Sequence, residues 1–288
     1  MPEDVALHEK RGNVAYITLN RPDKLNAMTD EMLDSVLAGV RRAEEDDDVK
    51  AVVIKANGKQ FCSGWDLNEI GRMYGIADVK PGERVKRAPQ RSGPLLDRRR
   101  SEKFGAILLS MKTTICQVQG YCFGAGWFLA LVCDFVIAAD DAVFAHTEQR
   151  LGASGTMWTL PLEILHCGPK KARELMLTGR DFGAAEAERL GLINRVVPAD
   201  KLEDEVGALT KAISLLPRDG LAIGKAYTNV TYDLLRMVSP FMQYSAVHPL
   251  IVGMKWADDE VSFPKERRDL GVREAARRRA ERYPKEYR

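Results

Sequence analysis

Alternation between strand-like and helix-like segments is the feature that most constrains what this chain can fold into. Short apolar runs rich in strand-forming residues predict strands at Val14–Leu19, Val49–Ala56, Thr113–Gln119, Asp134–Ala138, Ala142–Ala145 and Asn194–Val197. Apolar residues at helical spacing predict helices between them, the first of which begins after Thr29 or Asp30 and ends near Glu45. In the last third the spacing is helical throughout. The sequence therefore predicts an α/β core over residues 1–200, followed by a helical region over residues 201–288.

Two basic segments are hidden within a nearly neutral chain. The 288 residues include 43 Lys and Arg against 41 Asp and Glu, a net charge of +2. Yet Arg72–Lys103 holds ten basic and four acidic residues, and Pro264–Arg288 holds ten and five. The nearly neutral net charge excludes a protein that binds nucleic acid over its whole surface. The two basic segments, in contrast, are compatible with binding of a phosphorylated ligand. Glycines and prolines predict a long mobile loop in the first segment, and scarce apolar positions in Gly271–Arg282 predict an exposed tail or a subunit contact.

Several classes of protein are excluded by what the sequence lacks. No apolar run approaches the roughly 20 residues of a membrane span, and the first residues lack the apolar middle of a secretion signal. Five cysteines without a CxxC pair fit reduced thiols, so we expect a cytoplasmic protein without a membrane or nucleic-acid partner. Neither GxxxxGK[ST] nor GxGxxG occurs, and four scattered histidines predict no metal site. We therefore expect no prosthetic group.

Two glycine-containing turns each follow a predicted strand and precede a predicted helix. The first is Phe61-Cys-Ser-Gly64-Trp65-Asp66-Leu67 and the second is Gly120-Tyr-Cys-Phe-Gly124-Ala125-Gly126. Backbone N–H groups at the start of a helix have no partner within it and carry the positive end of the helix dipole. Two such groups aimed at one point make an oxyanion hole. Each turn alone is as often a packing feature, so the evidence lies in their combination.

In combination, the turns resemble those of a known superfamily. An FxxGxDL turn, a GYxxGxG turn roughly 55 residues later, the dipeptide Cys133-Asp134 and then Glu148 are similar to the pattern of the crotonase superfamily, the enoyl-CoA hydratase/isomerase family. The similarity also covers Val14–Pro22, Leu25–Ala27, Leu177–Gly179 and Gly191–Val197. It implies a crotonase-type spiral of ββα units with a helical C-terminal trimerisation region, assembled as a homotrimer or a dimer of trimers. It also implies an acyl-CoA thioester as substrate, with CoA as part of that substrate.

The resemblance implies a catalytic site built from backbone groups and one carboxylate. The N–H groups of Trp65 and Ala125 would bind the thioester oxygen and stabilise an enolate, and Glu148 would be the acid or base. A second glutamate of the simple hydratases falls here at Phe128, which favours proton shuttling by one carboxylate without excluding hydration. His146 lies two residues before Glu148, so on an extended backbone both would point to the same side. His146 is then either a second proton carrier or a histidine packed at a strand end.

The segments that hold CoA in the family match the first loop and the first turn of this chain. The predicted CoA-binding residues are Lys24, Leu25, Gly64, Asp66, Leu67 and Gly124. Lys24 is expected to contact a phosphate, and Leu25 and Leu67 are expected to form walls. We expect Asp66 and Asp134 mainly to bond N–H groups of turns or helix ends.

A bulky or cyclic acyl group is favoured by the side chains in and beside these segments. The predicted pocket residues are Trp65, Met73, Tyr74, Phe128, Met157 and Trp158. The predicted reaction is hydration or isomerisation of an unsaturated acyl-CoA. The alternative within catalysis is hydrolysis, or a hydratase-lyase reaction that cleaves a C–C bond of a bulky or aromatic acyl-CoA. The alternative outside catalysis is a relative that only binds acyl-CoA or RNA, against which the retention of Glu148 and both turns argues.

Overall fold

Two β-sheets organise the chain, which the computed structural model describes over residues 4–73, 92–152, 158–243 and 260–284. The larger sheet has the order β1-β2-β3-β4-β6-β9, with β1 antiparallel to β2 and the other pairs parallel. Its strands are β1 (Ala6–Arg11), β2 (Val14–Leu19), β3 (Ala51–Ala56), β4 (Thr113–Val118), β6 (Phe135–Ala139) and β9 (Arg195–Val197). The smaller sheet, in the order β5-β7-β8, consists of β5 (Tyr121–Phe123), β7 (Val143–Ala145) and β8 (Phe182–Gly183).

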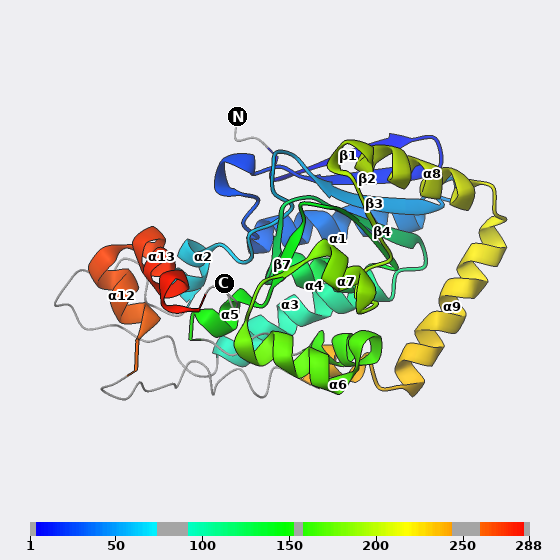
Figure 1. Cartoon of the computed structure of the whole chain (residues 1–288). Helices are drawn as coiled ribbons and strands as arrows, with labels where there is room; N and C mark the ends of the chain where they lie inside the picture. The colour runs from blue at the N-terminus through cyan, green and yellow to red at the C-terminus, as the bar shows by residue number, and fades with distance from the viewer. Residues whose placement is uncertain (1–3, 74–91, 153–157, 244–259, 285–288) are drawn as a thin grey trace.

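Helices cover both faces of the larger sheet (Figure 1). On one face, Leu202, Val206 and Ile213 of α8 (Leu202–Ser214) pack against apolar side chains of β2, β3, β4 and β6. The opposite face packs against α1 (Asp30–Glu45) and α4 (Ala125–Leu131). Burial on both faces explains why the central strands are continuous apolar runs in the sequence. The α/β fold predicted from the alternation of strands and helices is confirmed.

The first helix follows the expected boundaries, whereas the first basic segment and the residues around Glu148 differ from the prediction. The remaining helices are α2 (Leu67–Met73), α3 (Ser92–Leu108), α5 (Thr147–Arg150), α6 (Leu160–Thr178), α7 (Ala184–Arg189), α9 (Arg218–Leu234), α10 (Ser239–Gln243), α12 (Phe263–Leu270) and α13 (Val272–Arg282), with 3-10 turns at Pro22–Lys24 and Ala199–Lys201. Helix α1 begins after Thr29, whose Oγ1 accepts the N–H of Met32 at 3.1 Å. Helix α6 is interrupted at Gly168, with φ 75° and ψ 162°, directly before Pro169, which cannot donate a backbone hydrogen bond within a helix. Beyond β9, the regular elements of the described residues are all helical.

The first basic segment differs from the predicted loop. Residues 92–103 form the first part of α3, whereas residues 74–91 lie outside the described part of the chain. Helix α3 tolerates Pro94 because this residue stands in the first turn, where N–H groups have no partner in the helix. Arg100 of this helix is buried and pairs with Asp30 of α1 at 2.7 Å. Arg100 therefore links α3 to α1 through an ion pair, and its charge does not lie on an exposed loop.

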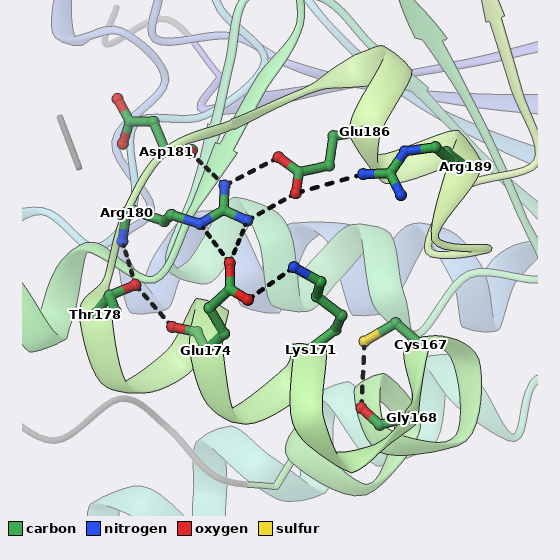
Figure 2. A network of polar contacts seen from close by, with 9 residues as sticks. All are labelled: Cys167, Gly168, Lys171, Glu174, Thr178, Arg180, Asp181, Glu186 and Arg189. Carbon is green, nitrogen blue, oxygen red and sulfur yellow. Dashed lines mark hydrogen bonds and ion pairs between the residues drawn. The ribbon is translucent and has the colours of Figure 1, made fainter. Parts of the chain in front are cut away.

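A network of ion pairs ties the end of α6 to α7 (Figure 2). The guanidinium of Arg180 donates to Glu174 of α6 at 2.8 Å and to Glu186 of α7 at 2.7 Å. Next to it in the chain, Asp181 accepts a hydrogen bond from Arg150 of α5. One short loop therefore fixes three helices relative to each other.

The second basic segment forms α12 and α13, which lie beside α2 at one end of the molecule (Figure 1). The guanidinium of Arg267 donates to the carbonyl oxygen of Leu67 at 2.8 Å. Arginines of α13 pair with acidic residues of the same two helices, namely Arg277 and Arg278 with Glu274, and Arg282 with Glu266. Residues 271–282, expected to form an exposed tail or a subunit contact, are the helix α13 and the glycine before it; most of them are exposed and Ala275 is buried, so the expected exposure is confirmed and the subunit contact stays a prediction.

Candidate active site

The structure brings the two glycine turns together. Cys62 of the first turn and Cys122 of the second form an isolated parallel bridge. The Cys62 N–H donates to the Tyr121 carbonyl at 2.8 Å, and the Phe123 N–H donates to the Cys62 carbonyl at 2.9 Å. The approach requires glycine at Gly126, because a Cβ there would lie 2.7 Å from the Cβ of Cys62. The starts of α2 and α4 are therefore held beside each other.

Two backbone N–H groups at these turns have no acceptor among the residues that the structure describes. Trp65 follows Gly64, whose φ is 101°, and Ala125 follows Gly124, whose φ is 47°. Within the described part of the chain, neither the Trp65 N–H nor the Ala125 N–H donates a hydrogen bond. Ala125 is the first residue of α4, a helical position that a residue other than glycine adopts without strain. Buried N–H groups normally have an acceptor, so the N–H of Trp65, two residues before α2, and that of Ala125, the first residue of α4, can each donate to an oxygen of a bound molecule.

The carboxylate of Glu148 lies directly against the second turn. A Cβ on Gly124 would collide with Oε1 of Glu148 and lie 3.1 Å from its Cδ. The Glu148 Oε2 is buried and has no hydrogen-bond partner among the described residues. Burial raises the pKa of Glu148, although the charges of His146 and Arg150 oppose the increase. A carboxyl group with a raised pKa beside the second turn can carry a proton to or from a bound molecule.

His146 occupies a different environment from the predicted one. The prediction assumed an extended backbone through Glu148, but Glu148 belongs to α5 and His146 immediately precedes that helix with φ −90° and ψ 77°. The same-side rule of a strand therefore does not apply to the two side chains. The His146 imidazole is buried, and its Nε2 lies 2.6 Å from Oε1 of Glu163, a buried carboxylate on α6. Burial alone would lower the pKa of His146, but the charge and hydrogen bond of Glu163 raise it overall.

The first loop is fixed against the first turn by Arg21. Its guanidinium donates to the carboxylate of Asp66 at 3.0 Å and to the Ala27 carbonyl at 2.6 Å. Lys24 and Leu25 are exposed on this loop, and Leu25 has a φ of 52°. Lys24 and Leu25, the two predicted CoA-binding residues of this loop, are therefore exposed on a loop that the hydrogen bonds of Arg21 hold beside the first turn.

Asp66 and Asp134 stabilise local structure, the role expected for both. Oδ1 of Asp66 accepts the N–H of Asn68 at 2.9 Å, at the start of α2. Oδ2 of Asp134 accepts the N–H of Thr114 at 2.8 Å, and its Oδ1 lies 2.6 Å from Nζ of Lys225 on α9. Asp134 therefore joins β4 to the C-terminal helices.

Four aromatic side chains form a buried cluster that includes the first turn. Trp65 lies 6.3 Å from Phe104 of α3, and Phe104 lies 6.1 Å from Trp158, as measured between ring centroids. The ring of Phe128 on α4 lies 6.0 Å from Trp158 and completes the cluster. The structure thus brings three predicted pocket residues together. The described side chains do not include the other three, which are Met73 at the end of α2, Tyr74 and Met157.

Three residues that the structure places around the site were not predicted from the sequence. Asn26 is buried, has a φ of 51° and donates through Nδ2 to two carbonyls at 2.8 Å each. Its signal was its loop position, since asparagine tolerates positive φ. Phe104 and Glu163 lie on helices, and the sequence does not distinguish a site residue there from an aromatic residue of the core or an acidic residue of the surface.

The described residues offer neither a metal site nor a membrane-spanning helix. These residues contain no cluster of three or more His, Cys, Asp or Glu side chains suited to a metal ion. None of the described helices combines the length and the apolar character needed to cross a bilayer. Burial raises the pKa of the Cys62 thiol to about 12, so this cysteine of the first turn is unreactive near neutral pH.

Comparison with known proteins agrees with this geometry. The sequence model of the family described as Enoyl-CoA hydratase/isomerase matches residues 9–238. The chain is 33% identical over 226 residues to a probable mitochondrial enoyl-CoA hydratase of Dictyostelium discoideum, covering 78% of this chain and 76% of the relative. It is also 33% identical over 233 residues to the probable enoyl-CoA hydratase echA8 of Mycobacterium tuberculosis, covering 81% of this chain and 84% of the relative.

Solved structures show the same fold. An enoyl-CoA hydratase/isomerase of Xanthobacter autotrophicus Py2 superposes with a TM-score of 0.83 at 30% identity, covering 97% of this chain and 98% of that one. A monofunctional enoyl CoA isomerase of M. smegmatis superposes with a TM-score of 0.62 at 28% identity, covering 80% and 94%. The fold, the paired turns and the family match agree, and the chain belongs to the enoyl-CoA hydratase/isomerase family, the crotonase superfamily.

Proposed function

We propose that this enzyme acts on an unsaturated acyl-CoA thioester through an enolate, with Glu148 as the acid or base. The observation that carries the proposal is the contact between the Glu148 carboxylate and Gly124, next to the free N–H of Ala125. In this arrangement the thioester oxygen accepts hydrogen bonds from the N–H groups of Trp65 and Ala125. Negative charge grows on that oxygen as the enolate forms, so the donors favour the transition state over the ground state. One such donor is worth about 3–4 kcal/mol.

Among the described residues, Glu148 is the carboxylate that lies against the paired turns, and a site with one carboxylate favours movement of a double bond. Phe128 is fully buried in the aromatic cluster and has no proton to exchange. For a 3-enoyl-CoA, Glu148 would take a proton from C2 and return it to C4, which leaves the carboxyl group unchanged after each turnover. Hydration is the second candidate, because the two similar proteins named above carry the name enoyl-CoA hydratase. The aromatic cluster supports a bulky or cyclic acyl group.

The CoA part of the substrate would lie along the first loop. Lys24 is exposed there and lies 3.5 Å from the carboxylate of Asp23, so its ammonium is available to a phosphate that competes with this surface pair. The ion pair between Arg21 and Asp66 holds the loop that carries Lys24 close to the first turn. Replacement of Lys24 by alanine should therefore raise KM for the CoA thioester with little change in kcat.

Turnover of a substrate panel tests the proposal. Crotonyl-CoA, a 3-enoyl-CoA and an aromatic enoyl-CoA would each be incubated in D2O, with mass spectrometry of the recovered thioesters. Formation of an enolate introduces deuterium at C2, isomerisation moves the double bond, and hydration adds the mass of water. We expect Glu148→Gln to reduce turnover by about 10²–10⁴-fold. Undiminished activity of this variant would remove Glu148 as the acid or base, and binding of all thioesters without exchange would indicate a non-catalytic protein.

We further propose assembly into a homotrimer or a dimer of trimers. One face of α9 supports this: Ile223, Tyr227, Val230 and Leu234 follow helical spacing and are 56%, 72%, 59% and 77% exposed in the single chain. An apolar stripe of this kind costs free energy in water and favours burial against another copy. Helix α9 runs along the side of the molecule opposite α12 and α13 (Figure 1).

A further inference from the structure

A buried guanidinium on α3 needs an explanation, because arginine keeps its charge in proteins. Arg100 belongs to the first basic segment of the sequence, yet its side chain is almost completely buried. Its Nε donates to Oδ1 of Asp30 at 2.7 Å, and its Nη2 donates to Oδ2 at 3.1 Å. Two parallel hydrogen bonds of this kind fix the plane of a guanidinium as well as its position. Arg100 therefore presents its flat face in a defined direction.

That face covers the indole of Trp65 in the first glycine turn. The Cζ of Arg100 lies 4.0 Å from the centroid of the indole, within the distance of a cation–π contact. Phe104, which is four residues further along α3, contacts the same indole with ring centroids 6.3 Å apart and an interplanar angle of 88°. Residues four apart lie on the same face of a helix. Two side chains of one face of α3 therefore restrict the orientation of the buried Trp65 side chain.

The backbone of Trp65 is bound to the chain segment that leads to Asp30. Met28 and Trp65 form an isolated parallel bridge, in which the Met28 N–H donates to the Gly64 carbonyl at 2.7 Å. The Gly64 carbonyl and the Trp65 N–H belong to one trans peptide group, so they point in opposite directions. The bond from Met28 therefore directs the Trp65 N–H away from Met28, and this N–H has no acceptor among the described residues.

We propose that Arg100 is a positioning residue of the oxyanion hole: it is bound to Asp30 and covers the indole of Trp65, and it thereby holds the Trp65 N–H in the direction from which that group donates to the thioester oxygen. The inference rests on the proposed role of the Trp65 N–H in binding that oxygen. A further contact supports it, since the carboxylate of Glu69 on α2 accepts the Asp30 N–H at 3.1 Å. The first turn, the start of α1 and the side chain of Arg100 are thus joined in one closed set of contacts.

Loss of the guanidinium should affect the reaction more than substrate binding. Without this cover the indole can take other rotamers, and the peptide group before Trp65 can tilt with it. The N–H is then misaligned with the oxygen on which negative charge grows, whereas the CoA part of the substrate keeps its contacts. We expect Arg100→Lys to lower kcat by about 10²-fold, the effect of misplacing a group by about 1 Å, with little change in KM. Lysine keeps the charge beside Asp30 but lacks the flat face.

Steady-state kinetics of a double-mutant cycle test the inference, with the thioester of the substrate panel that the wild type turns over fastest. Trp65→Phe keeps the backbone N–H and the ion pair of Arg100, so it tests the same contact if Arg100→Lys fails to fold. We expect both single variants to lose kcat and the double variant to be as active as the less active of the two, because each removes one contact. Full kcat in either single variant, additive losses, or an effect on KM alone would overturn the inference.

Arg98→Lys is the matched control, because it makes the same substitution on the same helix. Arg98 pairs with Glu102 at 2.7 Å, and the Arg98 side chain is exposed. A surface pair of this kind contributes little to stability, so this variant should keep the kcat of the wild type.

The amide signal of Trp65 gives a readout that does not need turnover. The chain has four tryptophans, so in protein labelled with nitrogen-15 tryptophan this signal is assigned by its loss in Trp65→Phe. The probe is butyryl-CoA, a saturated thioester that offers the carbonyl oxygen but has no double bond to move or hydrate. We expect the amide to shift on binding in the wild type and to shift less in Arg100→Lys. Equal shifts would overturn the inference and leave the proposed oxyanion hole intact, whereas no shift in the wild type would refute both.

Discussion

At the scale of single residues, the lack of a side chain on Gly124 allows the carboxylate of Glu148, the proposed acid or base, to lie against the second turn. The φ of 47° at this position favours glycine, and an added Cβ would collide with Oε1 of Glu148. We expect Gly124→Ala to displace the carboxylate and to reduce kcat by about 10²-fold, the effect of misplacing a reacting group by about 1 Å. Steady-state kinetics of Gly183→Ala provide the control, because Gly183 has a φ of −82° and no atom within 4 Å of an added Cβ. Equal kcat values for the two variants would contradict this account.

The burial of Glu148 has a consequence for pH dependence. Its pKa is raised in the folded state, so the base becomes ionised at a higher pH than an exposed glutamate, and kcat/KM should fall with decreasing pH through a pKa above the usual range. The effect of this group on stability is opposite to that of a carboxylate with a lowered pKa. Its burial is most favourable below the unfolded-state pKa, and the free energy of unfolding decreases as pH rises through the folded-state pKa. Glu148→Gln should therefore melt at a higher temperature than the wild type near pH 7 and at a similar temperature near pH 4. A lower melting temperature at pH 7 would argue against the buried ionised carboxylate.

The residues that were predictable from the sequence are those whose role depends on local order along the chain. Trp65 and Ala125 follow glycines of the two turns, and the resemblance to the crotonase superfamily indicated both positions, whereas the capping of α2 by Asp66 was expected from its place directly before a helix. Glu163 was not predictable, because its partner His146 is 17 residues away and their contact exists only after α6 folds back over α5. A contact between two titratable side chains far apart in the chain produces no repeating pattern that could be recognised in a single sequence.

At the scale of elements, the position of α5 depends on the loop after α6. Gly179 in this loop has a φ of 62°, and an added Cβ would lie 2.9 Å from the carbonyl oxygen of His146. Asp181 holds Arg150 of α5 from the same loop. The proposed acid or base and its histidine neighbour are thus supported by backbone packing from a segment about 30 residues further along the chain.

Arg180 is the residue that fixes this loop, and its contribution can be measured (Figure 2). Its hydrogen bonds lower the pKa of Glu186, and together with Lys171 they lower that of Glu174. We expect Arg180→Ala to lower the free energy of unfolding by about 1–3 kcal/mol, the usual range for hydrogen bonds to charged groups. Because both carboxyl pKa values are depressed on folding, this contribution is complete above about pH 4.5 and is lost as pH falls through the folded-state values.

Urea unfolding of Arg180→Ala and Arg189→Ala at pH 7 and at pH 3 measures this contribution. Arg189 is the matched control, since it is 67% exposed and lies 3.9 Å from the same Glu186. Its loss should change the free energy of unfolding by less than about 0.5 kcal/mol. Similar values for the two variants, or a loss in Arg180→Ala that persists at pH 3, would show that the network does not act through its ionised carboxylates.

Element boundaries were predictable where apolar spacing dominates and failed where tertiary contacts of charged residues dominate. The pattern of α1 and the strand at Val14–Leu19 predicted both elements closely. Strand β1 was missed because Ala6 is its one buried residue, so an edge strand of polar residues shows no alternation. The start of α3 was missed because Arg100 stabilises it through Asp30, a partner on another helix.

At the scale of the whole molecule, the exposed apolar stripe on α9 is the surface that supports the proposed assembly into trimers. The stripe faces away from the larger sheet, while Asp134 and Lys225 fix the helix to that sheet on its other side. Because this largely buried ion pair already fixes the helix in the single chain, the proposed contact would not need to fold on assembly. The charged C-terminal helices at the opposite end have no comparable stripe among their described residues.

Substitution within the stripe tests whether α9 is the subunit contact. We expect the wild type to sediment at three or six times the mass of one chain, and Val230→Asp to shift the mass toward one chain, because a buried unpaired charge opposes association. Leu177→Asp is the control, since Leu177 of α6 is 54% exposed but lies away from α9 in the sequence and on another helix. Sedimentation at several protein concentrations distinguishes true dissociation from a change of shape. A trimeric Val230→Asp protein together with a dissociated Leu177→Asp protein would move the contact from α9 to α6.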